Sequence, residues 1–517
     1  MSAEFLAFCH ANNVLFDSQL VEIRSSGLSH SIHAVKALKE GDVLCSIPKE
    51  AILSVRTTAI ADIIEQEEIG GIIGLSVAVM YEQSLGVASP FHAYIASLPS
   101  VQSIPYFWNQ ADVSELAGTD LANELVDLES DLQDDYRTII SPLLEKYPQL
   151  NPESMQFTHF MKVVSWCTSR AFDVDAYHNE SLVPFADLFN HKTCGENVHF
   201  TSDADVCPFC GSLGGCDCVV DDEEWEDTES AKSVAFTNDS IPNLAVNANG
   251  DELELRQDIL EMIIVKSCGP GDEIFSTYGK QSNTSLLNRY GFIEADNPYS
   301  CVAITRDQVL ECLPESISAE SVQDRLDFWE AVGMAIVEQI ESRSANDEEN
   351  DLFGDGEDVS DSNECIDSNL SHHEHDGQCC GSADQEMESE NECEEDDAES
   401  EDNEFLEDSF SILASGPNFS LRVFLGLMFL GDNSFDDMSR DLERSIENMV
   451  QFHKTKWDSS STRKEECTVI SMFCSQRLKE YPTTLKQDEM ISDAQDFFGL
   501  ALSLRMEEKK ILKSFIL

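Results

Sequence analysis

Apolar residues recur at two spacings along this chain, and the spacing separates predicted helices from predicted strands. Helices are expected where apolar residues lie three to five positions apart, as they do over residues 72–82, 112–146 and 157–172. Strands are expected where short apolar or alternating runs end at turn residues, as they do over residues 21–24, 32–35, 43–48 and 262–265. Residues 1–20 predict one more amphipathic helix, with Phe5, Phe8 and Cys9 on one side. This mixture predicts an α+β class for the first part of the chain.

The pattern changes after Asn297. Helical spacing dominates up to about residue 341 and again from residue 409 to the end, so this part is expected to be all-α. Between these helical stretches lies a tract, residues 342–408, that is rich in Asp, Glu, Ser and Asn. Such a composition buries too little apolar surface to offset the entropy lost on ordering. We therefore expect residues 342–408 to be a disordered acidic insertion.

Two runs stand out because their polar residues sit inside apolar surroundings: Leu182–Phe200 and Gly271–Phe292. In the second run, Glu273–Tyr278 has the alternation of a short half-buried strand. A helix over Ser282–Tyr290 follows, and Gly291 stands where a C-cap glycine belongs. Tyr278 and Tyr290 would then lie at the ends of two short elements, with their hydroxyls facing a shared space.

The first run contains Asp187, Asn190 and His191. From the residues alone, two interpretations remain open for the Asn-His pair. The pair can satisfy backbone groups in a buried turn, or it can hold a nucleotide-like ligand through an amide and an imidazole.

Taken together, the two runs resemble the closing half of a SET-domain protein lysine methyltransferase, of the branch that includes the plant RuBisCO large-subunit methyltransferase and fungal ribosomal-protein lysine methyltransferases. The matching pieces occur in the family's order: Pro184-x-x-Asp187-x-x-Asn190-His191, Asn197-Val198-x-Phe200, Gly271-Asp272-Glu273-Ile274, Tyr278-Gly279 and Tyr290-Gly291-Phe292. The resemblance implies a SET domain of short sheets over residues 1–296, with a helical insertion over about 57–180. It also implies a helical substrate-binding domain over residues 297–341 and 409–517.

The resemblance also implies the chemistry, which is transfer of a methyl group from S-adenosylmethionine to a protein lysine. Tyr278 would lie beside the transferred methyl and Tyr290 would line the lysine channel. Asn190, His191 and Arg170 would hold the methyl donor, with Arg170 on its carboxylate, and the backbone at Gly27 would lie against it. From the residues alone, Arg170 can equally be a helix C-terminal charge, and Gly27 can be an ordinary hairpin turn. Ser25, Ser26 and Ser29 surround Gly27 where the family often has a second glycine.

Residues 202–241 form an insertion that the resemblance does not explain. Within it, Cys207-Pro-Phe-Cys210-Gly places two thiols on one tight turn, and Cys216 and Cys218 follow closely. Four cysteines of this kind can form a tetrahedral structural zinc site, with Cys194 or His199 as possible replacements for one ligand. The alternative is four reduced thiols in a loop.

Composition restricts the partners. The chain of 517 residues carries 99 acidic and 32 basic residues, a net charge of −67. Nucleic-acid binding depends on basic residues that neutralise phosphates, so direct nucleic-acid binding is not expected and a basic protein partner is. The 17 cysteines follow no secretory pattern, and no apolar run reaches membrane-spanning length. A reducing location, cytoplasmic or nuclear, is therefore expected.

The sequence thus predicts a protein-lysine methyltransferase that acts on a ribosomal protein or a translation elongation factor. Two other functions remain open. A relative in this branch modifies histidine, so the chain can be a protein-histidine methyltransferase. The cysteine cluster and the acidic tract also fit a zinc-dependent, non-catalytic interaction scaffold.

Overall fold

The computed structural model describes residues 2–26, 29–100, 103–202, 206–212, 216, 218, 258–352, 410–440, 464–491 and 496–516. Side chains at positions 26, 29, 338 and 340–352 are not described. Gly27 and nearly all of the expected acidic insertion lie outside the described residues.

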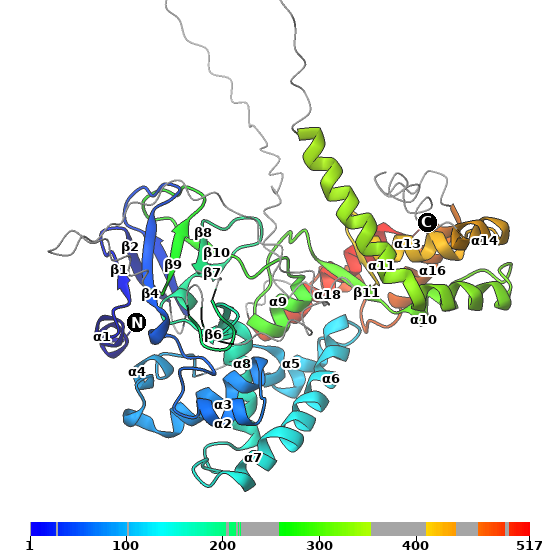
Figure 1. The fold of residues 1–517 in the computed structure, drawn as a ribbon. Helices are drawn as coiled ribbons and strands as arrows, with labels where there is room; N and C mark the ends of the chain where they lie inside the picture. Colours follow the sequence, from blue (N-terminus) through cyan, green and yellow to red (C-terminus); the bar gives the residue numbers. More distant parts are fainter. Residues whose placement is uncertain are drawn as a thin grey trace, which may run out of the picture. The chain divides into compact units, whose positions relative to one another are not determined.

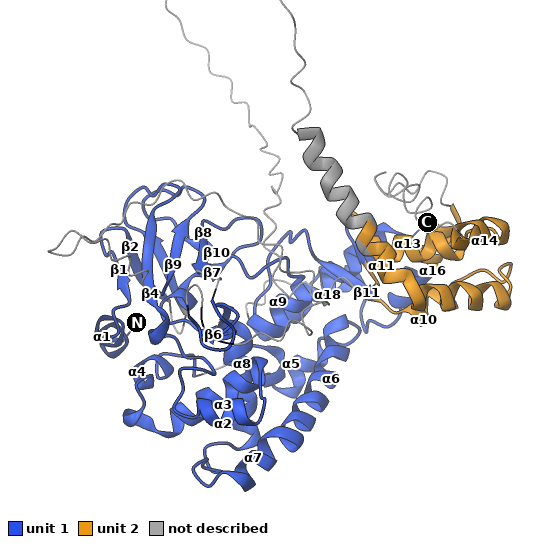
Figure 2. Cartoon of the chain, viewed as in Figure 1, with its two compact units in different colours: residues 1–303, 412–414, 473–516 blue, residues 304–411, 415–472, 517 orange. Residues whose placement is uncertain are grey.

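The chain divides into two compact units, which Figure 2 colours separately. The first unit comprises residues 1–303, 412–414 and 473–516, and the second comprises residues 304–411, 415–472 and 517. The last helix of the chain therefore belongs to the first unit. The predicted domains place residues 409–517 together in the helical part, so the two divisions differ at the C-terminus.

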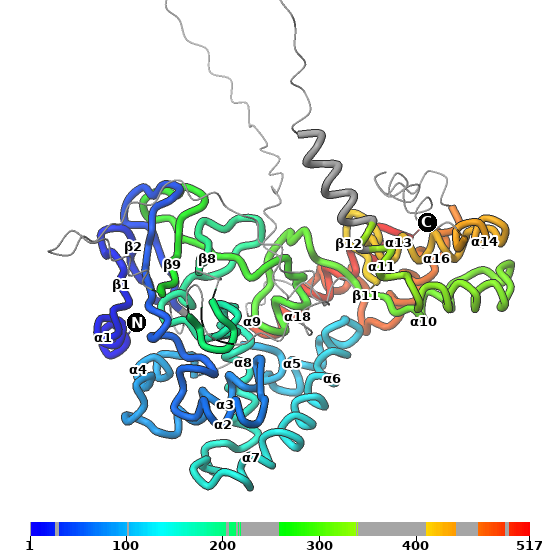
Figure 3. Tube along the Cα trace, viewed as in Figure 1, coloured from blue at the N-terminus to red at the C-terminus, as the bar shows by residue number. Residues whose placement is uncertain are grey.

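The first unit is built around a four-stranded sheet of order β1-β4-β9-β8. All three neighbouring pairs are antiparallel, and Figure 3 shows the blue strand β4 beside the green strand β9. Strand β9 alternates between half-buried and buried residues, so one of its faces supplies Leu260, Met262 and Ile264 to the core. The strands are β1 (Leu15–Phe16), β4 (Val43–Pro48), β8 (Val198–Ser202) and β9 (Ile259–Ile264).

Three smaller strand pairs also lie in the described part of the first unit. Two are antiparallel hairpins, and the third is a parallel pair that joins distant segments of the chain. The hairpins are β2 (Val21–Ser26) with β3 (Ser29–Ala34) and β5 (Ala171–Asp173) with β6 (Glu180–Leu182). The parallel pair is β7 (Asn190–His191) with β10 (Phe275–Ser276).

Helices between β4 and β5 form a second group in the first unit, visible in cyan and blue in Figure 1. Helices α3 and α8 pack together, and residues buried on both join the sheet in one core. The α-helices of this unit are α1 (Ala3–Ala11), α2 (Ala61–Gln66), α3 (Gly71–Ser84), α4 (His92–Ile95), α5 (Gln110–Ser114), α6 (Asp120–Asp135), α7 (Ser141–Lys146), α8 (Phe157–Arg170), α9 (Asn283–Tyr290), α17 (Leu485–Asp488) and α18 (Phe497–Ser514). Single helical turns are 49–51, 86–88, 105–107 and 186–188, and residues 136–140 form a π-helical turn.

Helix α18 packs against the rest of the first unit through a separate apolar cluster. Ala501 and Leu504 of α18 meet Leu116, Leu121 and Leu287 there. The Trp108 ring stacks on the Phe497 ring, with 5.0 Å between centroids. This cluster, far apart in sequence, explains why α18 belongs to the first unit.

The second unit is mainly helical. Its core includes a ring cluster in which Trp329 meets Phe424 edge to face, with 5.1 Å between centroids. The Arg325 guanidinium donates hydrogen bonds to the Leu427 carbonyl in the last turn of α13 and to the Leu430 carbonyl just beyond it. The elements are α10 (Arg306–Glu311), α11 (Ala319–Leu352), β13 (Gly416–Pro417), α13 (Phe419–Met428) and α14 (Asp432–Arg440). Strands β11 (Cys301–Ile304) and β12 (Phe410–Leu413) and helix α16 (Lys464–Arg477) span the boundaries of the units.

Several predicted elements need correction. The N-terminal helix ends at Ala11, because Asn13 takes a left-handed φ of 54° and strand β1 follows. The part expected to be all-helical also contains the short strands β11, β12 and β13. Helix α11 continues to Leu352, past the expected start of the acidic insertion. Within the described residues, no helix has the length and apolar character needed to span a membrane.

Candidate functional site

The two runs with buried polar residues meet in the structure through the parallel pair of β7 and β10. Phe275 pairs with Asn190, and Ser276 pairs with His191. Parallel pairing requires a long connection, and here that connection contains β8, the cysteine insertion and β9. The pairing places Asn190, His191 and Tyr278 at one place in the first unit.

The Asn190 side chain is held from two sides. Its amide nitrogen donates to the Glu273 carboxylate at 2.7 Å and to the His30 carbonyl oxygen at 3.3 Å. Glu273 lies in the segment that leads into β10, and His30 lies in strand β3 of the β2–β3 hairpin. The amide orientation is therefore fixed, with its nitrogen toward these oxygens.

His191 is buried and neutral. Burial lowers the pKa of its imidazole, and its Nδ1 accepts a hydrogen bond from the Tyr278 backbone N–H at 2.9 Å. Its Nε2 lies 2.9 Å from the Thr193 hydroxyl oxygen. Glu294 lies 3.8 Å from Nε2, but a neutral ring forms no ion pair with it. His191 thus performs the backbone role that the sequence left open, and it also presents a ring face to Tyr278.

Tyr278 lies between two rings. Its ring stacks on His191, with 4.9 Å between centroids, and on Tyr290, with 4.4 Å. Burial raises the pKa of the Tyr278 phenol to about 12, so the hydroxyl remains protonated at neutral pH. It points toward the Phe189 carbonyl oxygen at 3.5 Å, which is the long limit of a hydrogen bond. The rings of Tyr278 and Tyr290 therefore lie against each other, and the space that their hydroxyls were predicted to share stays a prediction.

Arg170 ends helix α8 and reaches the turn before β7. Its Nη1 donates to the Asp187 carbonyl oxygen at 3.1 Å and lies 3.5 Å from the Asp187 carboxylate. Tyr94 donates to the same carboxylate at 3.1 Å. Burial raises the pKa of Asp187, although Arg170 opposes this effect. Asp187 thus supports Arg170 and the turn.

Two polar atoms in this cluster are buried without a hydrogen-bond partner among the described residues: Arg170 Nε and Asp187 Oδ1. An unpaired buried polar atom costs about 1–3 kcal/mol, so such atoms indicate a place that a ligand or water completes. The Arg170 side chain is 26 % exposed, so a polar ligand can reach it from solvent.

Sequence reasoning missed two contributors. Phe185 has a φ of 80°, which is strained for a residue with a Cβ. Its buried ring stacks on the Phe16 ring, with 4.5 Å between centroids, and this packing holds the turn that positions Asp187. Glu273 fixes the Asn190 amide. Nothing in the local pattern marked Phe185, whereas Glu273 stood in the Gly271–Ile274 motif without a role assigned to it.

The four predicted zinc ligands also come together, apart from this cluster. The sulfurs of Cys207, Cys210, Cys216 and Cys218 all lie within 4.8 Å of one another. Neither possible replacement belongs to this group: Cys194 lies 3.8 Å from the Tyr299 hydroxyl, and His199 lies 4.0 Å from Glu196.

Comparison with known proteins shows which proteins this chain is similar to. Residues 389–512 match the family model described as RuBisCO LSMT substrate-binding. The chain is 25 % identical over 400 residues to ribosomal lysine N-methyltransferase 3 of Saccharomyces cerevisiae, covering 68 % of this chain and 71 % of the relative. It is 24 % identical to the N-lysine methyltransferases setd6 of Danio rerio and SETD6 of Homo sapiens, and it spans 56 % of the length of each.

Solved structures share the fold. The SET domain of LSMT bound to lysine and AdoHcy aligns with a TM-score of 0.58 and 17 % identity, over 99 % of this chain and 89 % of that one. The RuBisCO LSMT bound to AdoMet aligns with a TM-score of 0.55 and 17 % identity, over 100 % of this chain and 91 % of that one.

The sheet, its inserted helices and the paired runs thus share the fold of these SET-domain structures. The matched C-terminal model and the methyltransferase relatives make the chain similar to protein lysine methyltransferases of the RuBisCO large-subunit methyltransferase-like branch.

Proposed function

We propose that this chain transfers methyl groups from S-adenosylmethionine to a lysine of a basic protein involved in translation, with a ribosomal protein as the first candidate and an elongation factor as the second. The name of the yeast relative supports a ribosomal target. The net charge of −67 supports a basic partner, because opposite charge steers encounter and raises association rates. Such a target places the enzyme in the cytoplasm or the nucleus.

The observation that carries the site assignment is the convergence of Arg170, Asn190, His191 and Tyr278 on one cluster that contains an unpaired buried donor. We assign Arg170 to the carboxylate of the methyl donor, because its Nε has no partner among the described residues and a guanidinium suits a carboxylate. Asn190 and His191 would hold the adenosine and amino-acid parts. The backbone at Gly27, outside the described residues, would complete the pocket, since its hairpin contacts Asn190 through His30.

S-adenosylmethionine, when bound, supplies a methyl group on a positively charged sulfur that an amine can attack. The chain must present the lysine amine in its neutral form and in line with that methyl. An apolar, aromatic-lined channel disfavours the charged ammonium, and correct orientation lowers the barrier by several kcal/mol. The stacked rings of Tyr278 and Tyr290 supply such a wall. The Tyr278 hydroxyl, which remains protonated, would fix the reacting groups by hydrogen bonding.

Transfer of labelled methyl tests this proposal. Wild-type protein, S-adenosylmethionine carrying a labelled methyl and a lysate from cells that lack the protein are combined, and the labelled residue is mapped by mass spectrometry. We expect a labelled lysine. Tyr278→Phe should lower the turnover number about 100-fold, as loss of one positioned hydroxyl does in other active sites, while donor binding is kept. Asn190→Ala should weaken donor binding about tenfold, through the loss of roughly one hydrogen bond.

Tyr147→Phe is the matched control. Tyr147 also donates a hydrogen bond to a neighbour, the Glu67 carboxylate at 2.5 Å, but it follows α7 and lies outside the cluster. Its activity should equal that of the wild type. A labelled histidine would replace the lysine assignment with histidine methylation. Tight donor binding without labelling of any protein would overturn the enzyme assignment in favour of a binding scaffold.

A further inference from the structure

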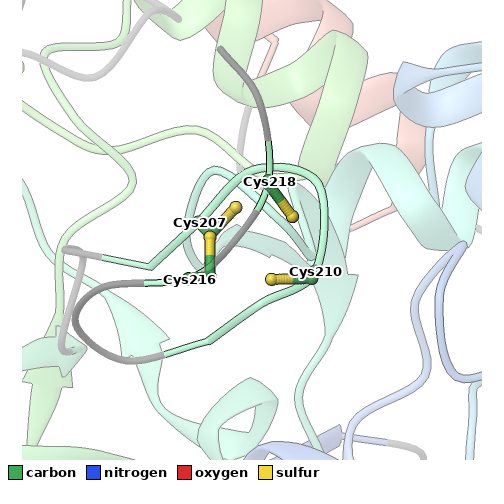
Figure 4. Close-up of side chains that lie close together, drawn as sticks. All are labelled: Cys207, Cys210, Cys216 and Cys218. Atoms are coloured by element: carbon green, nitrogen blue, oxygen red, sulfur yellow. The ribbon is translucent and has the colours of Figure 1, made fainter.

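The thiols of the insertion after β8 have the arrangement of a metal site. Figure 4 shows the sulfurs of Cys207, Cys210, Cys216 and Cys218 pointing toward one another. All four lie within 4.8 Å of one another. In a tetrahedral zinc site with Zn–S bonds of about 2.3 Å, neighbouring sulfurs are about 3.8 Å apart. A small contraction of this group would therefore produce the geometry of four-thiolate zinc.

Backbone hydrogen bonds within one turn orient the thiols of Cys207 and Cys210. The Gly211 N–H donates to the Cys207 carbonyl at 2.8 Å, and the Cys207 N–H donates to the Ser212 carbonyl at 3.1 Å. This closed turn places Cys207 and Cys210 on the same side. Gly211 has a φ of 68°, which other residues rarely adopt, so the glycine after Cys210 is required by the turn.

The same turn is packed against the body of the first unit. A Cβ at Gly211 would lie 2.7 Å from the Tyr177 ring, so the glycine also allows close contact. Tyr177 belongs to the β5–β6 hairpin and is held in turn by Arg56, whose guanidinium lies 4.9 Å above its ring and whose Nε donates to its carbonyl at 3.3 Å. The cysteine turn is thus attached to the hairpin that directly follows Arg170.

We propose that Cys207, Cys210, Cys216 and Cys218 bind one structural Zn²⁺, which fastens the start of the insertion to the β5–β6 hairpin. Four soft sulfur ligands in a tetrahedron select zinc among the common divalent ions. Four protein ligands leave no open position, so the ion stabilises the fold and takes no part in methyl transfer. Thiol protons are released when the ion binds.

The metal content of the full-length protein tests this site. After purification under reducing conditions and gel filtration in a mild chelator, inductively coupled plasma mass spectrometry should find one zinc per wild-type chain. Cys207→Ser combined with Cys210→Ser should remove it. Cys268→Ser is the control, since Cys268 is also half-buried but lies outside the cluster, and it should keep one zinc. Replacement of zinc by Co²⁺ should produce the visible spectrum of a tetrahedral thiolate site.

A second measurement does not depend on the folding of the variants. A strong chelator should lower the melting temperature of the wild type by several degrees, and added zinc should restore it. Zinc well below one equivalent, iron in its place, equal zinc in the double variant, or disulfides among the four cysteines would overturn the proposal. Metal content is measured without methyl transfer, so this result stands apart from the proposed enzymatic function.

Discussion

Lys49 and Lys146 make ion pairs of the same length in opposite surroundings. Lys49 Nζ lies 2.6 Å from Asp175 and 2.6 Å from Asp258, and its side chain is 2 % exposed. Lys146 Nζ lies 2.6 Å from Glu67 with a side chain that is 54 % exposed. Burial alone would raise the pKa of Asp175, but hydrogen bonds from His178 and Lys49 outweigh burial and hold it well below its usual range. The buried carboxylate is therefore charged and depends on Lys49.

Substitution of each lysine should show how burial changes the contribution of its ion pair to stability. Lys49→Met leaves a buried carboxylate without its cation and should lower the free energy of unfolding by about 3–5 kcal/mol. Lys146→Met removes a pair that water and salt already screen, so its effect should be too small to measure. Urea unfolding followed by circular dichroism measures both. Equal effects of the two substitutions would show that burial does not determine how much an ion pair contributes to the free energy of unfolding.

At this scale the sequence revealed residue identities better than partners. Asn190, His191, Tyr278 and Arg170 were recognisable because the family motifs place them. The contacts of Asn190 with Glu273 and of Arg170 with Asp187 were not, because each joins segments whose meeting no local pattern encodes. The strained φ of Phe185 left no trace in the sequence either, since the residue type gives no hint of it.

Helix α9 has both of its ends determined by single residues. The Ser282 hydroxyl accepts the Ser285 N–H at its start, and Gly291 closes its end in the left-handed region with a φ of 79°. A Cβ at Gly291 would lie 2.6 Å from the Ser103 Cβ and 2.8 Å from the Ser103 carbonyl carbon. Gly41 has a similar φ of 86° but nothing within 4 Å of such a Cβ. The two glycines therefore share a backbone conformation and differ in the space around them.

Alanine at these glycines should measure that difference. Gly41→Ala should lower the free energy of unfolding by about 1 kcal/mol, the cost of a left-handed residue with a Cβ. Gly291→Ala should lower it by roughly 2–4 kcal/mol, because crowding against Ser103 is added. Thermal and urea unfolding provide both values. If the two variants were equally stable, the close approach to Ser103 would have no energetic role.

Elements with local signals were predicted well. Strand β4 has the predicted bounds, and α9 differs from its prediction by one residue at the start. The parallel pair of β7 and β10 was not predicted as a pair, because each strand has only two residues and their pairing is decided by the core around them. Strand β1 was hidden in the expected N-terminal helix for the same reason: apolar residues fit either spacing over so short a run.

At the scale of the whole molecule, the last helix joins the first unit through charged side chains that it buries there. Arg505, Glu508 and Lys509 of α18 are each 1 % exposed. Arg505 and Lys509 both bind Asp488, and Arg505 also donates to the Glu115 carbonyl at 2.8 Å. Burial raises the pKa of Glu508, which accepts a hydrogen bond from the Tyr481 hydroxyl. These bonds and the Trp108 cluster make α18 part of the first unit.

A chain that ends at Met472 should therefore fail to fold as a stable first unit. It would lack the end of α16 together with α17 and α18, and it would expose Trp108, Leu116 and Leu121, which α18 covers. We expect aggregation or a broad, uncooperative thermal transition. The matched deletion replaces residues 353–409 with a short Gly-Ser linker, and it should keep the melting temperature because it removes none of these contacts. A soluble, cooperatively folding chain ending at Met472 would contradict the role assigned to α18.

The division of the chain into units was harder to predict from the sequence than its residues or its elements. Helical spacing correctly indicated α18, but its charged residues suggest an exposed surface, and only partners far along the chain show that they are buried. Sequence patterns report which face is apolar and not what covers a buried charge.

Strands β8 and β9 are neighbours in the sheet, and Ser202 pairs directly with Leu260. The chain leaves the sheet after Ser202 and re-enters it beside this residue. The β8–β9 pairing therefore does not depend on the number of residues between the two strands. Loop length changes the closure entropy only slowly. A fluorescent protein inserted after Cys218 should therefore leave the β8–β9 pairing intact. An insertion at this position would allow the protein to be followed in living cells.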